Sequence, residues 1–390
     1  MNHPPSPTSP SSNHPFCRLS HLGDVPVDTF LREYWQQKPL LIRQAFPNFV
    51  PPVSADELAG FALEDDIVSR LIVEDKKNKK WEVKHGPILE TTFANLPQQH
   101  WTLLVQHADL LDPELNQLIE AFRFIPSWRL DDLMISYATN GGGVGPHFDY
   151  YDVFLLQAQG KRRWRIGQKC DSDSAMIAGL DMKILQAFNT QEDWVLEPGD
   201  LLYIPPNIAH WGEAVDECMT YSFGFRAPSY SDIMLDFAQE MASITTEDMR
   251  YSDAGLSPQR LSGEITKEAL AKIKAILEHY TSNEGFVASW FGEYMTRANP
   301  GGDAASQGEF LPTDLNSGQT CKLSAFARCA FYQTSEHCIV FINGEKWHCS
   351  QKLAVLLSEH ETICFTQLAK QDQYIVKHLA EEGLLDYAEA

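Results

Sequence analysis

Three side chains near the centre of the chain have the types and spacing that could hold one metal ion. His147 and Asp149 lie two residues apart in Gly-Pro-His-Phe-Asp-Tyr, and His210 follows the run GDLLYIPPNIA. Residues two apart on a strand point to the same face, so the two side chains of the first pair would project together. Two histidines and one carboxylate hold Fe(II) on one side and leave the other coordination positions open. The sequence therefore predicts an iron site at His147, Asp149 and His210.

The glycines and prolines around these residues indicate the fold that carries them. Gly141-x5-His147 and Gly199-x5-Pro205-x4-His210 match the two halves of the cupin pattern, and this region resembles the JmjC-type branch of the 2-oxoglutarate-dependent oxygenases. The resemblance implies Fe(II), 2-oxoglutarate as co-substrate, and O2. Two alternatives stay open. One is an enzyme of another class, such as a cupin isomerase or a dioxygenase without 2-oxoglutarate; the other is a non-catalytic cupin that serves as a binding module.

A cation inside the barrel would favour the oxygenase, because the distal carboxylate of 2-oxoglutarate must be matched there. The run KRRWR follows a turn at Gly160, and strand alternation places Arg162 and Trp164 on one face and Arg163 and Arg165 on the other. The JmjC resemblance places the carboxylate-binding cation at Arg162, whose guanidinium can hold a carboxylate through two hydrogen bonds. A solvated basic strand is the alternative. Arg163 and Arg165 are expected to be exposed or paired with acids.

A hydroxyl group is expected beside that carboxylate. Ser136, within residues 134–138, is the favoured candidate, and Ser222, in the strand after the His210 loop, is the second. For each of them, a small hydrogen-bonded core residue is the alternative. Asp200 is expected to cap a turn rather than bind metal, and Cys218 is expected to be buried.

The elements that must position these residues are short strands. Apolar runs punctuated by Gly, Pro and Asp between residues 133 and 226 predict a sandwich or a small barrel. Helices are predicted at residues 30–34, from Ser54 onward, and at 109–121. The predicted strands are residues 38–43, 133–138, 153–157, 163–166, 194–196, 201–204 and 220–226.

Helical patterns dominate after Pro228. Residues 233–244 and 265–280 carry apolar side chains at three- and four-residue spacing, and the second stripe could form a dimer surface or cover a core. Asn343-Gly344, between runs 338–342 and 345–349, predicts a hairpin. Helices are predicted around it at 351–358, 366–370 and 372–383, and the whole resembles a winged-helix module.

The composition narrows the possible partners. The chain has 390 residues, of which 44% are hydrophobic and 22% are charged, as in soluble globular proteins. Its 31 Lys+Arg against 53 Asp+Glu give a net charge of −22, which repels nucleic-acid backbones and suits a basic partner. No signal-like segment opens the sequence, and no apolar run approaches the ~18 residues of a membrane helix. We therefore expect a cytoplasmic protein that binds neither DNA nor membranes.

Longer motifs carry a closer resemblance. The segments DDLMISYA (131–138), GGGVGPHFDYYDVFLLQ (141–157), GKRRWRIG (160–167), YSFGFRAPS (221–229) and FLREYWQQKPLLIRQAF (30–46) resemble the bacterial ribosomal oxygenases. That family comprises JmjC enzymes that hydroxylate an arginine of large-subunit ribosomal protein number sixteen.

The resemblance implies a function and a set of residues. It places iron ligands at His147, Asp149 and His210 and co-substrate contacts at Arg162 and Ser136. The implied reaction is hydroxylation of an arginine β-carbon in a basic ribosomal protein. Hydroxylation of a histidine of another ribosomal protein, or lysine demethylation, are the alternatives within the same chemistry.

Resemblance and pattern together predict an α+β protein. Its parts are a double-stranded β-helix (a cupin/JmjC jelly roll), a helical dimerisation region that makes a homodimer, and a C-terminal winged-helix domain. The predicted boundaries are a disordered tail at 1–16, the JmjC/cupin catalytic domain at 17–228, the helical region at 229–298, a linker at 299–320 and the winged-helix-like domain at 321–390.

Overall fold

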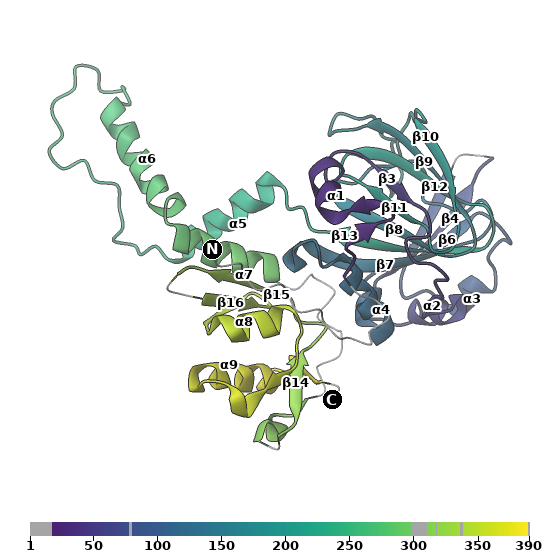
Figure 1. The fold of residues 1–390 in the computed structure, drawn as a ribbon. Coiled ribbons are helices and arrows are strands. Elements are labelled where there is room, and N and C mark those ends of the chain that lie inside the picture. The colour runs from purple at the N-terminus through teal and green to yellow at the C-terminus, as the bar shows by residue number, and fades with distance from the viewer. Residues whose placement is uncertain (1–17, 78–79, 298–309, 317, 336–337, 389–390) are drawn as a thin grey trace, which may run out of the picture. The chain divides into compact units, whose positions relative to one another are not determined.

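The structure is a computed structural model that describes residues 18–77, 80–297, 310–316, 318–335 and 338–388 (Figure 1). The chain divides into two compact units. The first comprises Met1–Pro126 and Leu130–Phe225, and the second comprises Ser127–Arg129 and Arg226–Ala390. The predicted tail at 1–16 and most of the predicted linker at 299–320 lie outside the described residues, and the other predicted boundaries stay predictions.

A large antiparallel sheet forms one wall of the first unit. Its eight strands follow the order β3-β11-β8-β13-β7-β6-β4-β5. The strands are β3 (Leu40–Ile42), β4 (Ser69–Asp75), β5 (Lys80–His85), β6 (Trp101–Val105), β7 (Leu130–Ala138), β8 (Asp152–Gln159), β11 (Leu201–Ile204) and β13 (Cys218–Phe225).

A smaller antiparallel sheet faces it. This sheet has the order β10-β9-β12, with β9 at Arg162–Lys169, β10 at Glu192–Leu196 and β12 at Ile208–Ala214. Apolar side chains of both sheets meet in one buried cluster, which includes Val153 and Leu202 of the large sheet and Ile166 and Leu196 of the small one. The predicted jelly roll is confirmed, and the inner faces of its two sheets enclose the residues of interest.

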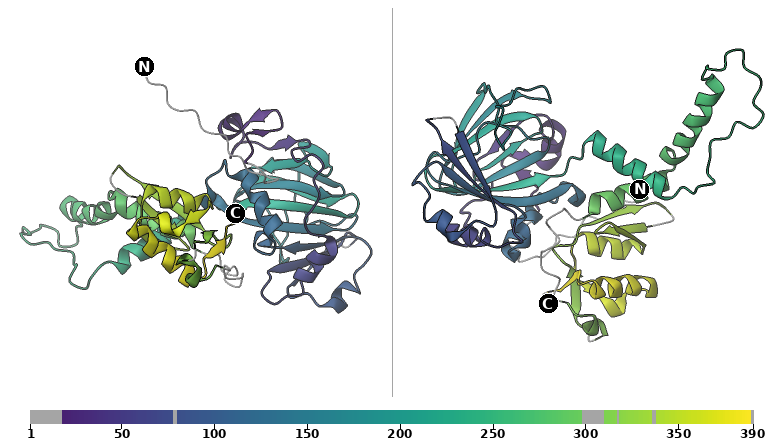
Figure 2. Two further views of the ribbon diagram at one scale, coloured as in Figure 1. Left: turned by 60° about the horizontal axis from the view of Figure 1, so that its bottom comes forward. Right: turned by 180° about the vertical axis from the view of Figure 1, so that it is seen from behind.

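Helices and aromatic residues cover the outer face of the large sheet, on the side away from the small sheet (Figure 2). Phe30 of the first helix packs against Phe154 and Tyr203, and Phe122 packs against Phe223. A short hairpin of β1 (His21–Leu22) and β2 (Val25–Pro26) precedes this layer. The helices of this unit are α1 (Val27–Glu33), α2 (Ala55–Phe61), α3 (Glu90–Phe93) and α4 (Pro113–Gln117).

The predicted helix at 109–121 is wrong in its extent. The structure has a 3₁₀ turn at Ala108–Leu110, then α4, then a second 3₁₀ segment at Leu118–Phe122. The side chain of Asp112 caps α4, and Pro113 takes its first position. Proline lacks a backbone N–H and clashes with the preceding turn, so a helix can begin there but cannot run through.

The second unit begins with helices. These are α5 (Tyr230–Ser243), α6 (Lys267–Thr281) and α7 (Glu284–Thr296), after a 3₁₀ turn at Ser127–Arg129. Within α7, Gly292 lies against the ring of Phe341, where a Cβ atom would be 2.3 Å from the ring carbon Cε2. This close approach seats α7 on a three-stranded sheet.

That sheet contains the predicted hairpin, which is confirmed. It consists of β15 (Cys329–Gln333), β16 (Cys338–Ile342) and β17 (Glu345–His348), with Asn343 and Gly344 in the turn at positive φ. The predicted helix at 366–370 is instead a 3₁₀ turn at Phe365–Gln367, and the next helix starts at Lys370. The remaining elements are η4 (Pro312–Asn316), α8 (Gln351–Ser358), α9 (Lys370–Glu381), β14 (Thr320–Leu323), β18 (Ile363–Cys364) and β19 (Leu385–Tyr387).

Among the described residues, no helix combines the length and the apolar character that would let it cross a membrane.

Candidate metal centre

The backbone sets His147 and His210 directly opposite each other. The N–H of His147 donates to the carbonyl of His210 over 3.0 Å, and the N–H of His210 donates back over 2.8 Å. Residues paired in this way on antiparallel segments carry their side chains on the same face. The two imidazoles therefore leave the backbone side by side, with ring centroids 4.2 Å apart.

Asp149 joins them from a segment that is not a strand. The sequence analysis placed His147 and Asp149 on one strand, but His147 makes only an isolated bridge and Asp149 lies in the irregular segment before β8. The carbonyl of Asp149 accepts the N–H of Asn207, at 2.7 Å, which ties this segment to the start of β12. The predicted convergence holds although its expected cause, strand alternation, is wrong.

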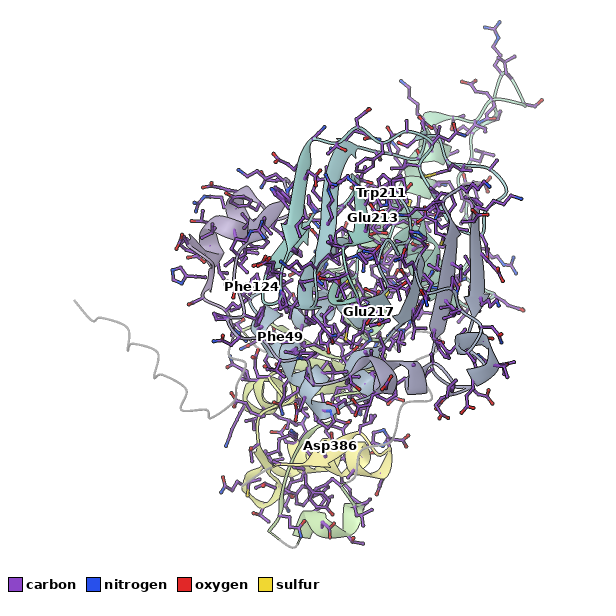
Figure 3. The ribbon with its side chains drawn as sticks, turned by 90° about the vertical axis from the view of Figure 1, so that its right-hand side faces the viewer. Phe49, Phe124, Trp211, Glu213, Glu217 and Asp386 are labelled. Carbon is purple, nitrogen blue, oxygen red and sulfur yellow. The ribbon has the colours of Figure 1, made fainter. Side chains whose placement is uncertain are left out.

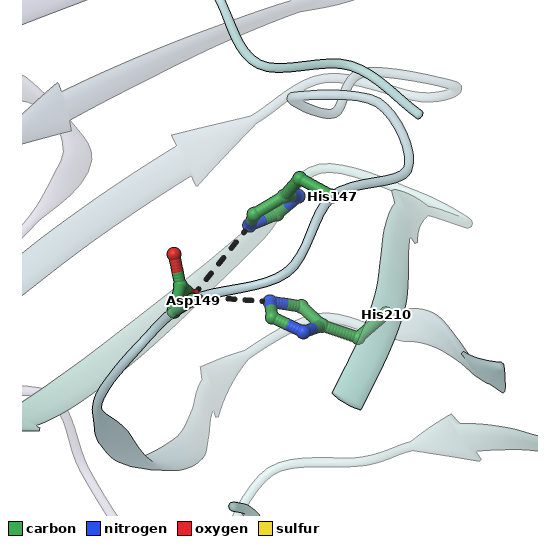
Figure 4. Close-up of side chains that lie close together, drawn as sticks. All are labelled: His147, Asp149 and His210. Atoms are coloured by element: carbon green, nitrogen blue, oxygen red, sulfur yellow. Dashed lines mark ion pairs between the residues drawn. The ribbon is translucent and has the colours of Figure 1, made fainter. Parts of the chain in front are cut away.

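The three side chains present their ligand atoms to one point (Figure 4). The Nε2 atom of His210 lies 3.4 Å from Oδ2 of Asp149, and Nε2 of His147 lies 3.9 Å from the same oxygen. The three potential ligand atoms all lie within 4.8 Å of one another. Among the described residues, this is the one group of three or more such side chains that could hold a metal ion.

Hydrogen bonds select which ring nitrogens face that point. Nδ1 of His147 lies 2.9 Å from the carbonyl of Gly145, and Nδ1 of His210 lies 2.9 Å from the carbonyl of Ile208. A carbonyl only accepts, so each Nδ1 carries the proton and each Nε2 keeps a free lone pair. This is the tautomer that a metal ligand requires.

Electrostatics keeps the site in its ligating form at neutral pH. Burial, together with the neighbouring His210, lowers the pKa of His147 to about 4, so its imidazole is neutral. Burial alone would raise the pKa of Asp149, but the proximity of the two imidazoles, His210 and His147, lowers it to about 2. Two imidazoles and a carboxylate are donors that fit Fe(II).

Arg162 lies within the barrel as an unpaired cation. It is 2% exposed, and no acidic side chain of the described residues forms an ion pair with it. Burial lowers the pKa of its guanidinium. A buried charge without a partner is costly, so the site fits an anionic ligand such as a carboxylate.

Ser136 holds this guanidinium in place. Nη1 of Arg162 donates to Oγ of Ser136 over 3.1 Å, and the Ser136 hydroxyl donates to the carbonyl of Thr220 over 3.3 Å. Ser222 lies on the same inner face, since the cross-strand pairs are Thr220 with Ser136 and Ser222 with Met134. Among the described residues no hydrogen bond joins Ser222 to Arg162, so of the two serines Ser136 is the one that the structure brings to the cation.

Two polar residues of this interior escaped the sequence analysis. The hydroxyl of Thr220 donates to Oε1 of Gln157 over 3.1 Å, and Nε2 of Gln157 donates to the carbonyl of Gln159 over 2.8 Å. Both side chains are buried, at 1% and 0% exposure. Strand alternation with Ser136 and Ser222 was the signal that could have found them.

The opposite face of the small sheet is polar, as expected. Arg163 pairs with Asp193, and Arg165 pairs with Glu213 at 3.1 Å. Figure 3 shows Trp211 and Glu213 on β12, and the guanidinium of Arg165 lies 4.5 Å from the centre of the Trp211 ring. These side chains alternate with His210 and so belong to the outer face.

Two further expectations are confirmed. Asp200 accepts the backbone N–H of Gln44 at 2.9 Å and that of Glu197 at 3.0 Å, which caps a turn. Cys218 is fully buried, and burial raises the pKa of its thiol.

Comparisons with known proteins agree with this site. The family model described as the JmjC domain matches residues 117–233. The chain is 37% identical over 269 residues to the Ribosomal protein uL16 3-hydroxylase of Escherichia coli, an alignment that covers 69% of this chain and 71% of that protein. The chain belongs to the ribosomal oxygenases.

Other ribosomal oxygenases extend the likeness. A probable ribosomal oxygenase of Haemophilus influenzae is 38% identical over 269 residues, with 67% of this chain and 65% of that protein covered. The crystal structure of Escherichia coli YcfD covers 95% of this chain with a TM-score of 0.83 and 29% identity, and all of that chain is covered. Structures of YcfD, a ribosomal oxygenase from Escherichia coli, contain cobalt with 2-oxoglutarate or with succinic acid.

As a ribosomal oxygenase of the JmjC class, the chain is an oxygenase that uses Fe(II), 2-oxoglutarate and O2. The donors found here fit both groups. Two imidazoles and a carboxylate suit the metal, and a buried, unpaired guanidinium suits a dicarboxylate.

Proposed function

We propose that this ribosomal oxygenase hydroxylates the β-carbon of an arginine in large-subunit ribosomal protein uL16. The observation that carries the proposal is the convergence of His147, Asp149 and His210 beside the unpaired Arg162 within one barrel. The identity to the uL16 3-hydroxylase supports the choice of substrate and of the 3-position, which is the β-carbon. The strongly acidic composition suits a basic ribosomal protein.

In this proposal the triad holds Fe(II) through the two Nε2 atoms and the Asp149 carboxylate. The chemistry that bound Fe(II) and 2-oxoglutarate supply is the oxidation of an unactivated C–H bond by O2, with succinate and CO2 as co-products. Arg162 binds the distal carboxylate of the co-substrate, and Ser136 orients the guanidinium. Arg162, Ser136 and His210 are buried, which keeps bulk water from the co-substrate end of this interior.

A single experiment tests the substrate and the ligands together. Purified uL16 is incubated with the protein, Fe(II), ascorbate and 2-oxoglutarate, and its peptides are analysed by mass spectrometry. We expect the added mass of one oxygen atom on one arginine, and we expect none when 2-oxoglutarate is omitted. Turnover of 2-oxoglutarate on a different ribosomal protein would keep the oxygenase and reject uL16 as its target.

Replacing a ligand should abolish the reaction without unfolding the chain. His147→Ala and Asp149→Ala each remove one of three metal donors, so we expect loss of Fe(II) binding and of hydroxylation with an unchanged circular dichroism spectrum. His21→Ala, at an exposed histidine outside the barrel, is the matched control and should retain activity. Hydroxylation by a variant that binds no metal would refute the assignment of these ligands.

We further propose that the protein is cytoplasmic, because the relatives are bacterial and bacterial ribosomal proteins are made and assembled in the cytoplasm. We also propose that it forms a homodimer, because α6 exposes a row of apolar side chains. Leu270, Ile273, Ile276 and Leu277 are each 45–52% exposed. Contiguous exposed apolar surface marks an interaction site. The occupant we propose is the same helix of a second copy.

The C-terminal part is proposed to be a winged-helix-like docking domain rather than a DNA-binding one. The β15–β17 sheet with α8 and α9 supports the winged-helix assignment, and the acidic balance of the chain argues against contact with a phosphate backbone. A mobility-shift titration with double-stranded DNA should show no complex at physiological salt.

A further inference from the structure

The inner face of β9 carries a buried hydrogen-bond donor, the indole of Trp164, that has no role in the site described above. Trp164 is 5% exposed, and its indole Nε1–H has no acceptor among the residues that the structure describes. An unsatisfied buried donor destabilises the folded protein, because it has lost its hydrogen bonds to water without gaining others. Such a group in a native protein therefore indicates a missing partner.

The register places Trp164 between the proposed co-substrate cation and the metal centre. Across β9 and β12, Arg162 pairs with Ala214, Trp164 pairs with Gly212, and Ile166 pairs with His210. Residues at alternate positions share a face. Trp164 therefore lies on the inner face midway between Arg162 and the position that pairs with His210.

Distances agree with this placement. The guanidinium carbon Cζ of Arg162 lies 5.1 Å from the centre of the Trp164 ring. The rings of Trp164 and His210 have centroids 6.0 Å apart, and Figure 4 shows His210 reaching the metal centre from β12. A ligand that joins Arg162 to the metal centre must pass Trp164.

Gly212 leaves room for this arrangement. A Cβ atom at position 212 would lie 2.7 Å from Cη2 of Trp164 and 2.8 Å from Nε of Arg162. That Nε–H is also buried and has no acceptor among the described residues. Two unpartnered donors thus face the same interior, and a bound dicarboxylate would bring oxygen acceptors for both.

We propose that Trp164 is a co-substrate-binding residue whose Nε1–H donates a hydrogen bond to an oxygen of bound 2-oxoglutarate. This inference rests on the proposed function, because it requires 2-oxoglutarate to lie between Arg162 and the metal triad. It adds a neutral donor to the ionic contact of Arg162. A donor at this position contributes to affinity and fixes the orientation of the co-substrate.

The test measures binding of 2-oxoglutarate directly in the full chain loaded with Zn(II). The Zn(II)-loaded protein does not consume the co-substrate, because Zn(II) is not redox-active. Protein labelled with ¹⁵N at the indole nitrogens is titrated with 2-oxoglutarate, and the Trp164 signal is assigned by its absence in Trp164→Phe. We expect this signal to move downfield on binding. Calorimetry should show at least about tenfold weaker binding of 2-oxoglutarate to Trp164→Phe, since a hydrogen bond to a charged group is lost.

The matched control is Trp194→Phe, which changes the cross-strand neighbour of Trp164 on β10. It should bind 2-oxoglutarate as the wild type does. Under turnover, Trp164→Phe should raise KM for 2-oxoglutarate with little change in kcat, whereas a general loss of packing would lower kcat. If Trp164→Phe does not fold, benzothienylalanine at position 164 keeps the ring shape and replaces the N–H with sulfur.

The outcomes separate this inference from the proposed function. If the wild type binds 2-oxoglutarate and the Trp164 signal stays in place, or if Trp164→Phe binds equally well, the inference is overturned and the oxygenase assignment stands. If the metal-loaded wild type binds no 2-oxoglutarate, both are overturned.

Discussion

At the scale of single residues, the site is defined by hydrogen bonds that fix protons. Each Nδ1–H of His147 and His210 is tied to the carbonyl two residues earlier in the chain, so each Nε2 is presented without a proton. Arg162 shows the complementary case of a charge held in place by Ser136 and left for a ligand to neutralise. Both features prepare the site before any ligand arrives, which lowers the ordering cost of binding.

Arg162 allows a graded test of charge against geometry. Arg162→Lys keeps the charge but loses the planar fork, so we expect about tenfold weaker binding of 2-oxoglutarate to the Zn(II)-loaded protein. Arg162→Met removes the charge and should weaken binding further, without lowering the melting temperature of the unliganded protein, because an unpaired buried cation is removed. Calorimetry and thermal unfolding measure the two effects.

Arg163→Met is the control for this series, since Arg163 lies on the outer face and pairs with Asp193. It should leave co-substrate binding unchanged. An equal loss of 2-oxoglutarate affinity in Arg162→Met and Arg163→Met would mean that the total charge of β9, rather than the buried guanidinium, determines co-substrate binding.

Asp132 on β7 gives a prediction about pH. Burial, together with the nearby charges of Asp131 and Asp109, raises the pKa of its carboxyl from the ordinary 3.8 to about 6. His107 acts in the opposite direction and lowers this pKa. The folded protein therefore binds this proton more tightly than the unfolded chain, and the stabilisation is present at low pH and is lost as the pH rises through about 6. We expect Asp132→Asn, which cannot ionise, to gain stability relative to the wild type between pH 4 and pH 7.

Chemical denaturation of both proteins at several pH values measures that difference. If the difference between the denaturation midpoints of Asp132→Asn and the wild type stays constant from pH 4 to pH 7, the raised pKa of Asp132 is contradicted. Asp28→Asn, at an exposed carboxyl in the first turn of α1, is the control for removing a surface charge.

At the scale of elements, the residues at the N-termini of the short helices determine where these helices begin. Helix α2 starts at Ser54, whose hydroxyl accepts the N–H of Glu57, while the Glu57 carboxylate accepts the N–H of Ser54. This reciprocal capping box was visible in the sequence as an N-terminal helix signal. In helix α4, in contrast, Pro113 takes the first position, so the helix cannot extend back through it toward Asp109.

Removing the cap should loosen α2 locally. Ser54→Ala deletes the side-chain acceptor, which typically costs about 1 kcal/mol. Amide hydrogen exchange should therefore accelerate in the first turn of α2, while amides of β8 and β13 in the core stay as slow as in the wild type. Ser54→Asp keeps an acceptor and should restore protection, so loss of protection in both variants would point to another cause.

At the scale of the whole molecule, the chain joins a barrel that encloses the metal-site residues and Arg162 to a unit whose helices expose apolar side chains. In α6, Ile273 and Leu277 are 45% and 52% exposed although the helix pattern would normally bury them. An exposed stripe of this kind marks an interaction surface, and the partner that we propose for it is the same helix of a second copy of the chain.

A charge placed in the stripe should separate the copies. Ile273→Glu would bury a carboxylate in the proposed dimer, so we expect the mass measured by light scattering to fall from that of two chains to that of one. Ala271→Glu, on the opposite side of α6, adds the same charge and should leave the dimer intact. A wild type that runs as one chain at micromolar concentration would rule out the dimer.

The sequence by itself determined the residue types of the metal site, the face of β9 that carries Arg162 and Trp164, and the jelly-roll class. The metal-site residues and the jelly-roll class follow from motifs that resemble the cupin and JmjC patterns, and the face of β9 follows from strand alternation; both are local properties of the chain. The sequence analysis did not predict β4, β5 and β6, which extend a sheet whose central strands lie far along the chain.

Only the tertiary structure decided how the site is assembled. The bridge between His147 and His210, the place of Asp149 outside any strand, and the choice of Ser136 as partner of Arg162 all depend on contacts between segments distant in sequence. The same holds for the unpartnered N–H of Trp164, since whether a buried donor finds an acceptor depends on every group packed around it.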